Sequence, residues 1–515
     1  MTSLWLERHP QTSEDGNTFP ASDFGPDASY DVVVVGAGLT GLVTGLLLAR
    51  AGKHVAIVEA LRVGGLTTGN TTAKLSLLQG AKYSEMLKHT AVGNAQAYVD
   101  SNREGFEWLL RYLDDHDVAY QRRAAYSYAG TPEGAATVDQ EVLAASRLGL
   151  PVEKVRDLDV PFPTYGAVRL ADQAQFDPLD VLEAMAADFR ARGGTIVEGV
   201  RVTGVRALST GPGKPAIVST TAGDVRAEKV VLATGIPILD RGLYFSKVIP
   251  SRSYALSFRI PETSVPHDFG MFITVDAPTR TLRTIPGHPA DADPDGRFLL
   301  VGGNDHVVGQ HPHPKDLVTD LVTWTHSYYP DAELTHTWAA QDYKSDNLIP
   351  FVGWLPRGGG KVYVATGFDK WGMTNGVAAG IRLSATILGG HLPWAETMGH
   401  RMTRPRSLLL GAAAGAEIGK QAATGWIGGL TAPSVETAPQ PAEGQGEIRR
   451  AGARPVGVCT VAGVTSTVSA VCPHLGGIVN WNDQELSWDC PLHGSRFRAD
   501  GTRIEGPTTA DLKPV

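Results

Sequence analysis

Cysteine is scarce in this sequence, with 3 residues among 515. So few thiols cannot build a disulfide framework, which is typical of proteins in a reducing cytoplasm. The N-terminus also lacks the basic-then-apolar layout of a secretory leader. We therefore expect a cytoplasmic protein, with residues 1–29 as a polar, partly disordered lead-in.

Net positive charge is lacking too, because 46 Lys and Arg face 54 Asp and Glu, a net charge of -8. This excludes the basic surface that a nucleic-acid partner requires. Long apolar runs are also few. The run ending at Glu59 is broken by glycines and is barely long enough to span a bilayer. Residues 408–430 could rest on a membrane or a partner, but Glu417 and Lys420 interrupt them, and we expect a linker and no membrane partner.

A nucleotide-binding motif opens the first apolar segment. Val32–Val35 predict a buried parallel strand. A helix and a second β-branched run follow and lead to Glu59, whose carboxylate can accept hydrogen bonds from ribose hydroxyls. Between strand and helix stand three glycines in G-x-G-x-x-G spacing, Gly36, Gly38 and Gly41. They permit a tight turn, the approach of a pyrophosphate and close packing of the helix on the strand. FAD and NAD share this motif, so it does not choose between them.

Further segments are expected along the dinucleotide. Residues 70–74 (NTTAK) either follow it or form an ordinary surface loop. Residues 229–235 (KVVLATG) and 361–367 (KVYVATG) predict buried strands, and glycines after the second lead into another helix. The cofactor-binding residues predicted from all these segments are Gly36, Gly38, Leu39, Thr40, Gly41, Glu59, Ala60, Thr71, Thr72, Lys74, Val202, Ala233, Thr234, Gly235, Gly367, Trp371, Gly372, Met373 and Thr374.

A β-rich region begins at Ile249. Alternating polar and apolar residues there predict a mixed or antiparallel sheet on the substrate side. Five candidate catalytic residues lie on this layer or near turns that face the cofactor, and a structural role is equally open for each. They are Arg252, Tyr254 and Arg283, whose side chains could bind a carboxylate, with Tyr343 and Trp371.

The most specific motif is a pair of Cys/His turns near the C-terminus. Its predicted metal ligands are Cys472, His474, Cys490 and His493. Two Cys and two His suit zinc or a Rieske [2Fe–2S] centre. The flanking glycines of C-x-H-L-G and C-P-x-H-G-S favour the Rieske centre. Cys459 lies in an apolar strand and is expected to be a core thiol.

The chain resembles known families over most of its length. VVVVGAGLTGL, VAIVEA, FDPLDVLEAMA, KVVLATG, WAAQDY and VYVATGFDKWGMTNG resemble the D-amino-acid oxidase/glycine oxidase-like superfamily of FAD oxidoreductases. AVCPHLGGIVNWN and SWDCPLHGSRF are similar to a Rieske domain. The order of the two is similar to bacterial FAD/Rieske fusion oxidoreductases. With one G-x-G-x-x-G and no second copy, FAD without a dedicated NAD(P)H site is expected.

Two departures from the Rieske pattern affect the expected cluster environment. Many high-potential Rieske proteins carry two further cysteines in a disulfide, and here Gly477 and Leu492 stand at those positions. Ser495 matches a serine that hydrogen-bonds to sulfur, but Phe497 replaces the usual tyrosine. Fewer hydrogen bonds to sulfur predict a reduction potential below the top of the Rieske range.

The resemblance implies an α/β FAD-binding Rossmann-type (glutathione-reductase-like) domain with an interleaved mixed β-sheet substrate domain, plus a small all-β C-terminal Rieske domain. The FAD-dependent oxidoreductase domain is expected over 30–404, a linker over 405–431 and the Rieske domain over 432–515. Within the first, the FAD part is expected at 30–85, 165–248 and 354–404, and the substrate part at 86–164 and 249–353.

The implied function is oxidation of a small amine or amino acid at a CH–NH or CH–NH2 bond. Electrons would pass singly through the [2Fe–2S] cluster to an external carrier. Two alternatives are a reductase fed by a ferredoxin-type donor and a non-catalytic redox module, although the long substrate-type region argues against the second. A Rieske oxygenase is disfavoured because the remaining histidines show no facial-triad spacing.

Overall fold

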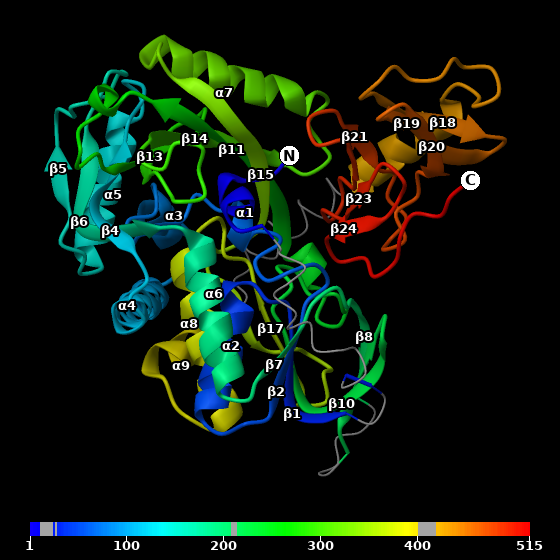
Figure 1. The fold of residues 1–515 in the computed structure, drawn as a ribbon, viewed down its shortest axis with the longest axis horizontal. Coiled ribbons are helices and arrows are strands. Elements are labelled where there is room, and N and C mark those ends of the chain that lie inside the picture. The colour runs from blue at the N-terminus through cyan, green and yellow to red at the C-terminus, as the bar shows by residue number, and fades with distance from the viewer. Residues whose placement is uncertain (11–23, 26–27, 208–213, 400–418) are drawn as a thin grey trace.

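The computed structural model describes residues 1–10, 24–25, 28–207, 214–399 and 419–515. Two large sheets form the body of the molecule, and a small all-β unit projects from one corner (Figure 1). The chain enters both large sheets repeatedly, so neither sheet is one continuous stretch of sequence.

The first sheet is the nucleotide-binding layer, with strand order β16-β17-β10-β1-β2-β7. Neighbouring strands from β17 to β7 run parallel. Alternate side chains of β1 face opposite ways: Val32 and Val34 pack in the core with the helices, while Val33 and Val35 pack with β8 and β9. The strands are β1 (Ser29–Val35), β2 (Val55–Val58), β7 (Thr195–Val197), β8 (Val202–Arg206), β9 (Ala216–Thr220), β10 (Gly223–Leu232), β16 (Phe351–Trp354) and β17 (Val362–Thr366).

Helices cover the first face of this sheet, and α2 packs against both α6 and α8 (Figure 1). Asp177 caps α6 by accepting the Leu179 amide, and Pro178 occupies the first helical position, as the sequence predicts. The labelled helices are α1 (Leu4–Arg8), α2 (Leu39–Arg50), α3 (Lys82–His89), α4 (Val92–Asp115), α5 (Ala135–Arg147), α6 (Pro178–Ala191), α7 (Pro314–Tyr328), α8 (Gly372–Leu388) and α9 (Pro393–Gly399), with 3₁₀ turns η1 (Thr68–Asn70), η2 (Tyr244–Ser246) and η3 (Glu262–Ser264), and residues 419–431 are helical as well.

The second sheet has the order β15-β11-β14-β13-β12-β4-β6-β3, with β5 beside β6. Its pairs are antiparallel except β12 with β4, which run parallel, so the sheet is mixed as expected. The strands are β3 (Lys74–Leu75), β4 (Tyr120–Tyr128), β5 (Glu153–Val155), β6 (Ala167–Phe176), β11 (Val248–Ile260), β12 (Met271–Thr274), β13 (Arg280–Pro286), β14 (Arg297–Val307) and β15 (Glu333–Ser345).

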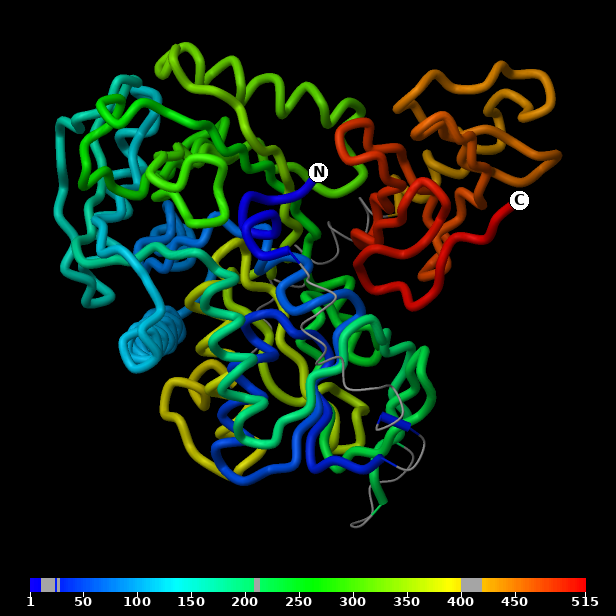
Figure 2. The backbone as a smooth tube through the Cα atoms, viewed as in Figure 1, coloured from blue at the N-terminus to red at the C-terminus, as the bar shows by residue number. Residues whose placement is uncertain are grey.

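The C-terminal unit contains a three-stranded and a four-stranded antiparallel sheet around its own core, which includes Trp488 and Phe497. It lies beside β11, β15 and the end of α7 (Figures 1 and 2). The strands are β18 (Gly446–Ala451), β19 (Arg454–Val461), β20 (Val464–Ser469), β21 (Asn480–Asn482), β22 (Ser487–Asp489), β23 (Arg496–Arg498) and β24 (Arg503–Glu505).

The structure differs from the predicted segment bounds at several places. Residues 4–8 of the expected polar lead-in form α1, because Leu4 and Trp5 find apolar partners and are buried. Residues 419–431 of the expected linker are helical and pack on the C-terminal unit, where Trp426 Nε1 donates to Gly476 O (2.9 Å). Residues 405–418 lie outside the described residues. Finally, β3 and β6 pair within the substrate sheet, and β16 pairs within the nucleotide sheet.

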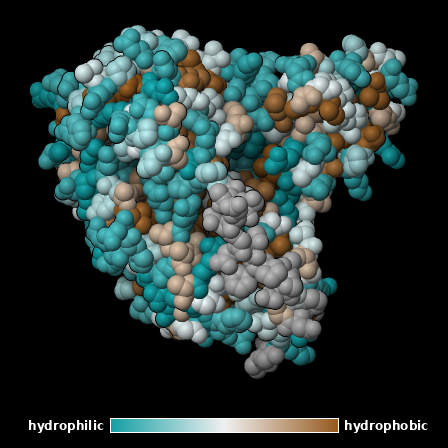
Figure 3. All heavy atoms as spheres, viewed as in Figure 1, coloured by the Kyte–Doolittle hydropathy of each residue, from teal (hydrophilic) through white to brown (hydrophobic). Residues whose placement is uncertain are grey.

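A search of the described residues finds no helix that is both long and apolar enough to cross a bilayer. The face shown in Figure 3 is mostly hydrophilic, with scattered hydrophobic side chains.

Candidate functional site

A cavity of about 280 Å³ lies between the two large sheets and the C-terminal unit. Its wall contains the glycine-rich turn after β1, residues of β11 and β15, and residues 503–506 of β24 with the turn that follows it. Sixteen of the residues predicted to bind the cofactor line this cavity: Gly36, Gly38, Leu39, Thr40, Glu59, Ala60, Thr71, Thr72, Lys74, Val202, Ala233, Thr234, Gly235, Trp371, Gly372 and Met373.

The turn after β1 has the shape that a bound dinucleotide requires. Gly36 adopts φ +105°, and a Cβ there would lie 2.6 Å from Ala233 O. A Cβ on Gly41 would lie 1.9 Å from Gly36 O, so α2 approaches the turn only because this residue has no side chain. These contacts leave the turn and the start of α2 open to the cavity. The residues present therefore fit the pyrophosphate of FAD.

Glu59 lies in the cavity wall at the end of β2. Its carboxylate accepts the amides of Ala37 (2.8 Å) and Leu61 (2.9 Å). Burial raises the pKa of Glu59, while these two amides and the charge of Arg201 act in the opposite direction. The amides fix the orientation of the carboxylate and leave further lone pairs for ribose hydroxyls.

Lys74 is a predicted cofactor-binding residue that the fold buries in the cavity wall. Lys74 Nζ donates to Phe272 O (3.0 Å) and to Thr281 Oγ1. Burial and the charge of Arg283 hold the pKa of Lys74 well below its usual range. Asn70, Thr71, Thr72 and Lys74 are thus part of the cavity wall, so this segment is not an ordinary surface loop.

Asp342 is a cavity residue that the sequence analysis missed. Its carboxylate accepts the amides of Tyr343 (2.7 Å) and Lys370 (2.6 Å). Burial raises the pKa of Asp342 to about 6, which is close to neutral pH. The neighbouring Asp305 instead pairs with Lys370 (2.9 Å), and this pair lowers the pKa of Asp305 despite its burial. No sequence signal marks Asp342, because only the fold buries it.

Three predicted cofactor residues lie outside the cavity lining. Gly41 packs α2 against the turn, Gly367 adopts φ +83° after β17, and Thr374 Oγ1 accepts from Gln79 Nε2 (3.2 Å). Their roles here are in packing the wall. Among the candidate catalytic residues, Tyr254, Tyr343 and Trp371 line the cavity.

The two arginines expected to bind a substrate carboxylate do not line the cavity. Arg283 donates to Ala73 O (2.7 Å) and Phe176 O (3.1 Å) and lies buried against Trp5. Arg252 pairs with acids of the C-terminal unit. The prediction for both residues is wrong, because buried backbone carbonyls and carboxylates already use their guanidinium groups.

The four predicted metal ligands lie together on two loops of the C-terminal unit. A hydrogen bond from the Cys490 thiol lowers the pKa of Cys472, and the same pairing raises the pKa of Cys490, so the sulfurs adjoin. The imidazole rings of His474 and His493 lie 5.0 Å apart. Burial of His493 and the charge of His474 lower the pKa of His493 to about 4, which keeps its imidazole neutral. His474 Nδ1 is buried without a hydrogen-bond partner among the described residues, as a metal ligand would be.

The spacing of these ligands separates zinc from a binuclear cluster. All four residues are described, yet no three of their ligand atoms lie within 4.8 Å of one another. Ligands of a tetrahedral zinc with bonds of about 2.0–2.3 Å would lie closer together than this. Two sulfurs on one side and two imidazoles on the other instead fit a [2Fe–2S] centre.

The positions of the missing disulfide adjoin each other beside this centre. A Cβ on Gly477 would lie 2.6 Å from Leu492 Cδ1 and 3.1 Å from Cys490 Sγ. Leu492 thus fills the space with an apolar side chain. The Ser495 hydroxyl hydrogen-bonds to Cys472 and helps to lower its pKa, while Phe497 is fully buried.

The cluster loops contact the cavity wall directly. Gln341 Nε2 donates both to the Tyr343 hydroxyl (2.8 Å) and to Gly494 O (2.8 Å), which follows His493. The Phe245 ring packs edge-on against the rings of His474 (5.0 Å) and His493 (4.9 Å). His474 Nε2 also pairs with Asp240 Oδ1 (2.8 Å). The imidazole side of the centre therefore faces the nucleotide-binding body of the molecule.

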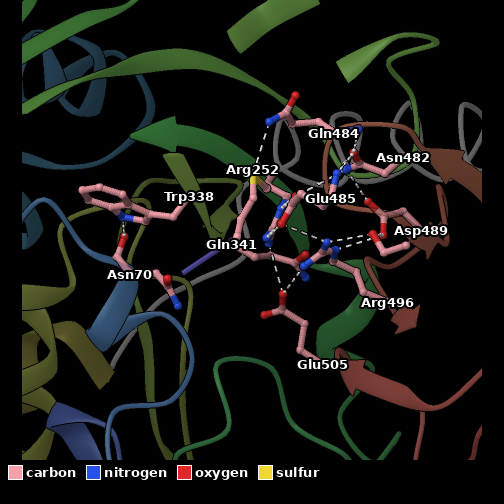
Figure 4. Close-up of polar contacts among 12 residues, drawn as sticks. Asn70, Arg252, Trp338, Gln341, Asn482, Gln484, Glu485, Asp489, Arg496 and Glu505 are labelled. Atoms are coloured by element: carbon pink, nitrogen blue, oxygen red, sulfur yellow. Dashed lines mark hydrogen bonds and ion pairs between the residues drawn. The ribbon is translucent and has the colours of Figure 1, made fainter. Parts of the chain in front are cut away.

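A buried ionic network fixes this arrangement (Figure 4). The Arg252 guanidinium on β11 pairs with Glu485 and with Glu505 (3.1 Å) of the C-terminal unit. Arg496 pairs with the same two acids at 3.1 and 3.0 Å and with Asp489 at 2.9 Å. Two guanidinium groups and three carboxylates thus share one buried site across the junction.

Comparison with known proteins agrees with both halves of this geometry. The FAD dependent oxidoreductase (DAO) family matches residues 31–386. The chain belongs to this family. The Rieske [2Fe-2S] domain family matches residues 435–515. The protein is therefore an FAD-dependent oxidoreductase that carries a Rieske [2Fe–2S] domain, with FAD and the cluster as its cofactors.

Individual relatives have the same organisation or the same fold. The chain is 29% identical over 519 residues to the Bacillus subtilis protein named "Putative Rieske 2Fe-2S iron-sulfur protein YhfW", covering 99% of this chain and 97% of the other. Glycine oxidase from Geobacillus kaustophilus has a similar structure, with a TM-score of 0.58 and 20% identity over 71% of this chain and 96% of the other. L-proline dehydrogenase from P. horikoshii has a TM-score of 0.56 and 16% identity over 72% of this chain and 96% of the other.

Proposed function

We propose that this oxidoreductase oxidises the C–N bond of a small amine or amino acid and passes the electrons singly to an external carrier. Bound FAD supplies two-electron hydride chemistry and the Rieske cluster one-electron transfer. One observation carries the proposal: residues 503–506 of the Rieske domain form part of the wall of the flavin cavity. A cluster domain placed there serves electron exchange with the flavin rather than an unrelated task.

Side chains between the flavin cavity and the cluster loops connect the two sites directly. Gln341 joins Tyr343 of the cavity wall to Gly494 beside the ligand His493. Phe245 fills the space against both histidine rings. These side chains are buried or packed, so they exclude water and hold the two parts in one geometry.

The substrate class rests on the family and on the cavity. The structural relatives include an enzyme named for glycine and one named for L-proline, and the fold is shared. Asp342, with a pKa of about 6, is ionised at neutral pH and can hold a substrate ammonium and accept its proton. Loss of that proton and of the C–H hydrogen as hydride, which bound FAD would accept, would convert the substrate ammonium to an iminium ion. Tyr254, Tyr343 and Trp371 supply aromatic walls.

The test combines a substrate screen with a variant that lacks the cluster. A panel of amines and amino acids is mixed anaerobically with the wild type and with Cys472→Ser. We expect the same compound to bleach the flavin in both proteins. Only the wild type should then develop the electron paramagnetic resonance signal of a reduced Rieske centre and reduce a one-electron acceptor.

Two results would contradict the proposal. If Cys472→Ser turns over with O2 as fast as the wild type does with any acceptor, the cluster is not on the catalytic route. If a reduced ferredoxin reduces the Rieske centre and then bleaches the flavin, while no amine does so, the enzyme is a reductase fed from outside.

A further inference from the structure

A second group of metal-ligand side chains lies outside the flavin cavity and the Rieske centre. Among the residues that the structure describes, His9, Asp180 and His288 are the one set of three whose ligand atoms all lie within 4.8 Å of one another. They come from three segments: the end of α1, the first turn of α6 and the turn after β13. We propose that this cluster binds a divalent transition-metal ion of the zinc type, with Asp177 as a further ligand.

The orientation of His9 carries the proposal. His9 Nδ1 hydrogen-bonds to Glu183 Oε1 (2.8 Å), so the other ring nitrogen is directed elsewhere. Nε2 faces Asp180 Oδ1 at 3.4 Å and Asp177 Oδ2 at 3.7 Å. The His9 side chain is 9% exposed. Neither its Nε2 nor Asp177 Oδ2 has a hydrogen-bond partner among the described residues. A buried nitrogen that faces two carboxylate oxygens is stabilised by a positive charge between them, which is either a proton or a metal ion.

A proton on His9 is the competing explanation. Burial alone would lower the pKa of His9, but the neighbouring carboxylates of Asp177 and Glu183 raise it to about 10. A proton on Nε2 would form a charge-assisted bond of about 2.7–2.9 Å to one carboxylate, and neither oxygen is that close. Ligands of a tetrahedral zinc with bonds of about 2.0–2.1 Å lie about 3.3 Å apart. The observed spacings of 3.4 and 3.7 Å match this arrangement better than a protonated pair.

The surrounding charges favour a dication. Charged or titratable groups face the cluster from every element packed against it: Arg8, Arg62, Asp177, Asp180, Glu183, Arg283, His288 and Asp291. Arg8 pairs with Asp291 at 2.8 Å and lies 3.6 Å from Asp177 Oδ2, and Arg62 donates to His9 O at 2.8 Å. The guanidinium groups of Arg8, Arg62 and Arg283 are thus outnumbered by the carboxylates of Asp177, Asp180, Glu183 and Asp291. The Ala290 amide donates to His288 Nδ1 (3.1 Å), and a metal on that nitrogen replaces this hydrogen bond. Glu183, on the far nitrogen of His9, then orients the ring as outer carboxylates do in zinc sites.

Such an ion would join α1 to α6 and to the turn after β13. The same helix carries Trp5, whose indole donates to Thr71 O (2.8 Å) in the wall of the flavin cavity. The site is therefore structural in kind: it joins three segments of the chain and lies apart from the reacting groups, while the Asp180 side chain stays 32% exposed, so the ion can enter from solvent.

The experiment uses the holoprotein with its iron and flavin measured first. Wild type, Asp180→Asn, His288→Ala and the control His267→Ala, whose histidine is exposed, are incubated with Zn²⁺, desalted and analysed for metal. We expect one zinc per chain in wild type and control and at least a tenfold lower affinity in the other two. Unchanged iron and flavin in the variants show that they are folded. The zinc X-ray absorption edge should show only N/O ligands at about 2.0–2.1 Å.

Sulfur ligands in the X-ray spectrum would place the zinc at the Rieske cysteines and overturn the proposal. It would also be overturned if zinc is absent from the wild type at micromolar concentration, or if Asp180→Asn and His288→Ala retain it as tightly as the control.

Discussion

Replacing Arg252 by methionine should loosen the Rieske domain from the flavin domain. The substitution keeps an apolar stem but removes the one cation that β11 contributes to the buried network. The Arg252 side chain is 4% exposed, and Glu485 opposite is 9% exposed, so water cannot replace the lost partner while the domains stay docked. Undocking would hydrate Glu485 and Glu505, and this is the change that we expect.

The size of the effect follows from Glu485. Burial would raise the pKa of this acid, but Arg252 and Arg496 together lower it from its ordinary 4.5 to about 2. A difference of about 2.5 pKa units corresponds to about 3 kcal/mol, shared between the two guanidinium groups. Arg252 acts as the larger of the two charges on Glu485. Its loss should therefore cost on the order of 2 kcal/mol, or a tenfold to hundredfold decrease in the docking equilibrium constant.

Small-angle X-ray scattering of the holoprotein measures this directly. We expect a larger radius of gyration for Arg252→Met than for the wild type, with iron and flavin content unchanged. The matched control is Arg206→Met, which removes an exposed ion pair with Asp224 within the flavin domain and should leave the radius as it is. Identical scattering curves for Arg252→Met and wild type would show that the ionic network does not hold the domains together.

The remaining predictions concern cofactors and pH. Purified protein should contain one FAD, two irons and two acid-labile sulfides per chain, and zinc at the Rieske ligands without labile sulfide would contradict this. Cys490→Ser should remove the cluster and retain the flavin, whereas Gly38→Glu should exclude the flavin pyrophosphate and spare the cluster, as absorbance and iron analysis will show. Because burial raises the pKa of Asp342 to about 6, its base form increases as pH rises through 6. Stopped-flow flavin reduction by an amine should accelerate over that range, and Asp342→Asn should lose this pH dependence.

The stability of the fold depends on the ionisation of Asp342 in the opposite direction to the rate of flavin reduction. A carboxyl whose pKa is raised from 3.8 to about 6 by folding stabilises the protein fully only below pH 3.8. That contribution is lost as pH rises through 6. Catalytic use of the base form and the stability of the fold therefore oppose each other at this residue.

Local patterns predicted the parts of this protein that short stretches of chain determine. The turn around Gly36 and Gly41, the cap of α6 at Asp177 and the four cluster ligands each depend on neighbours in sequence, and they lie where the patterns place them. The interactions of the Arg252 and Arg283 side chains depend on partners more than 100 residues away in sequence. A β-strand arginine has the same local signal whether it binds a substrate or another domain.

Predictions of a linker and of a polar N-terminal lead-in relied on amino-acid composition, and the structure differs from both where side-chain packing decides it. Residues 419–431 are rich in Ala and Gly, which is typical of linkers, but they form a helix whose small residues let it pack on the Rieske domain: Ala422 contacts its core, and Gly425 and Gly429 approach Ile478 and Pro455. The polar N-terminus contains one tryptophan, and its burial orders the residues around it. Asp342 had no signal at all, because its pKa is a property of the assembled cavity.

The short helix α1 also has a practical meaning for handling the protein. The sulfur of Met1 contacts Gln484 in the Rieske domain (3.2 Å), Trp5 holds Thr71, and Arg8 donates to Pro286 O (2.9 Å) in the substrate sheet. Eight residues thus touch all three units of the molecule. At the other end, Val515 is 66% exposed and lies on the outer side of the Rieske domain (Figure 2). A purification tag or a fluorescent label belongs after Val515, since one placed before Met1 would compete with three sets of native contacts.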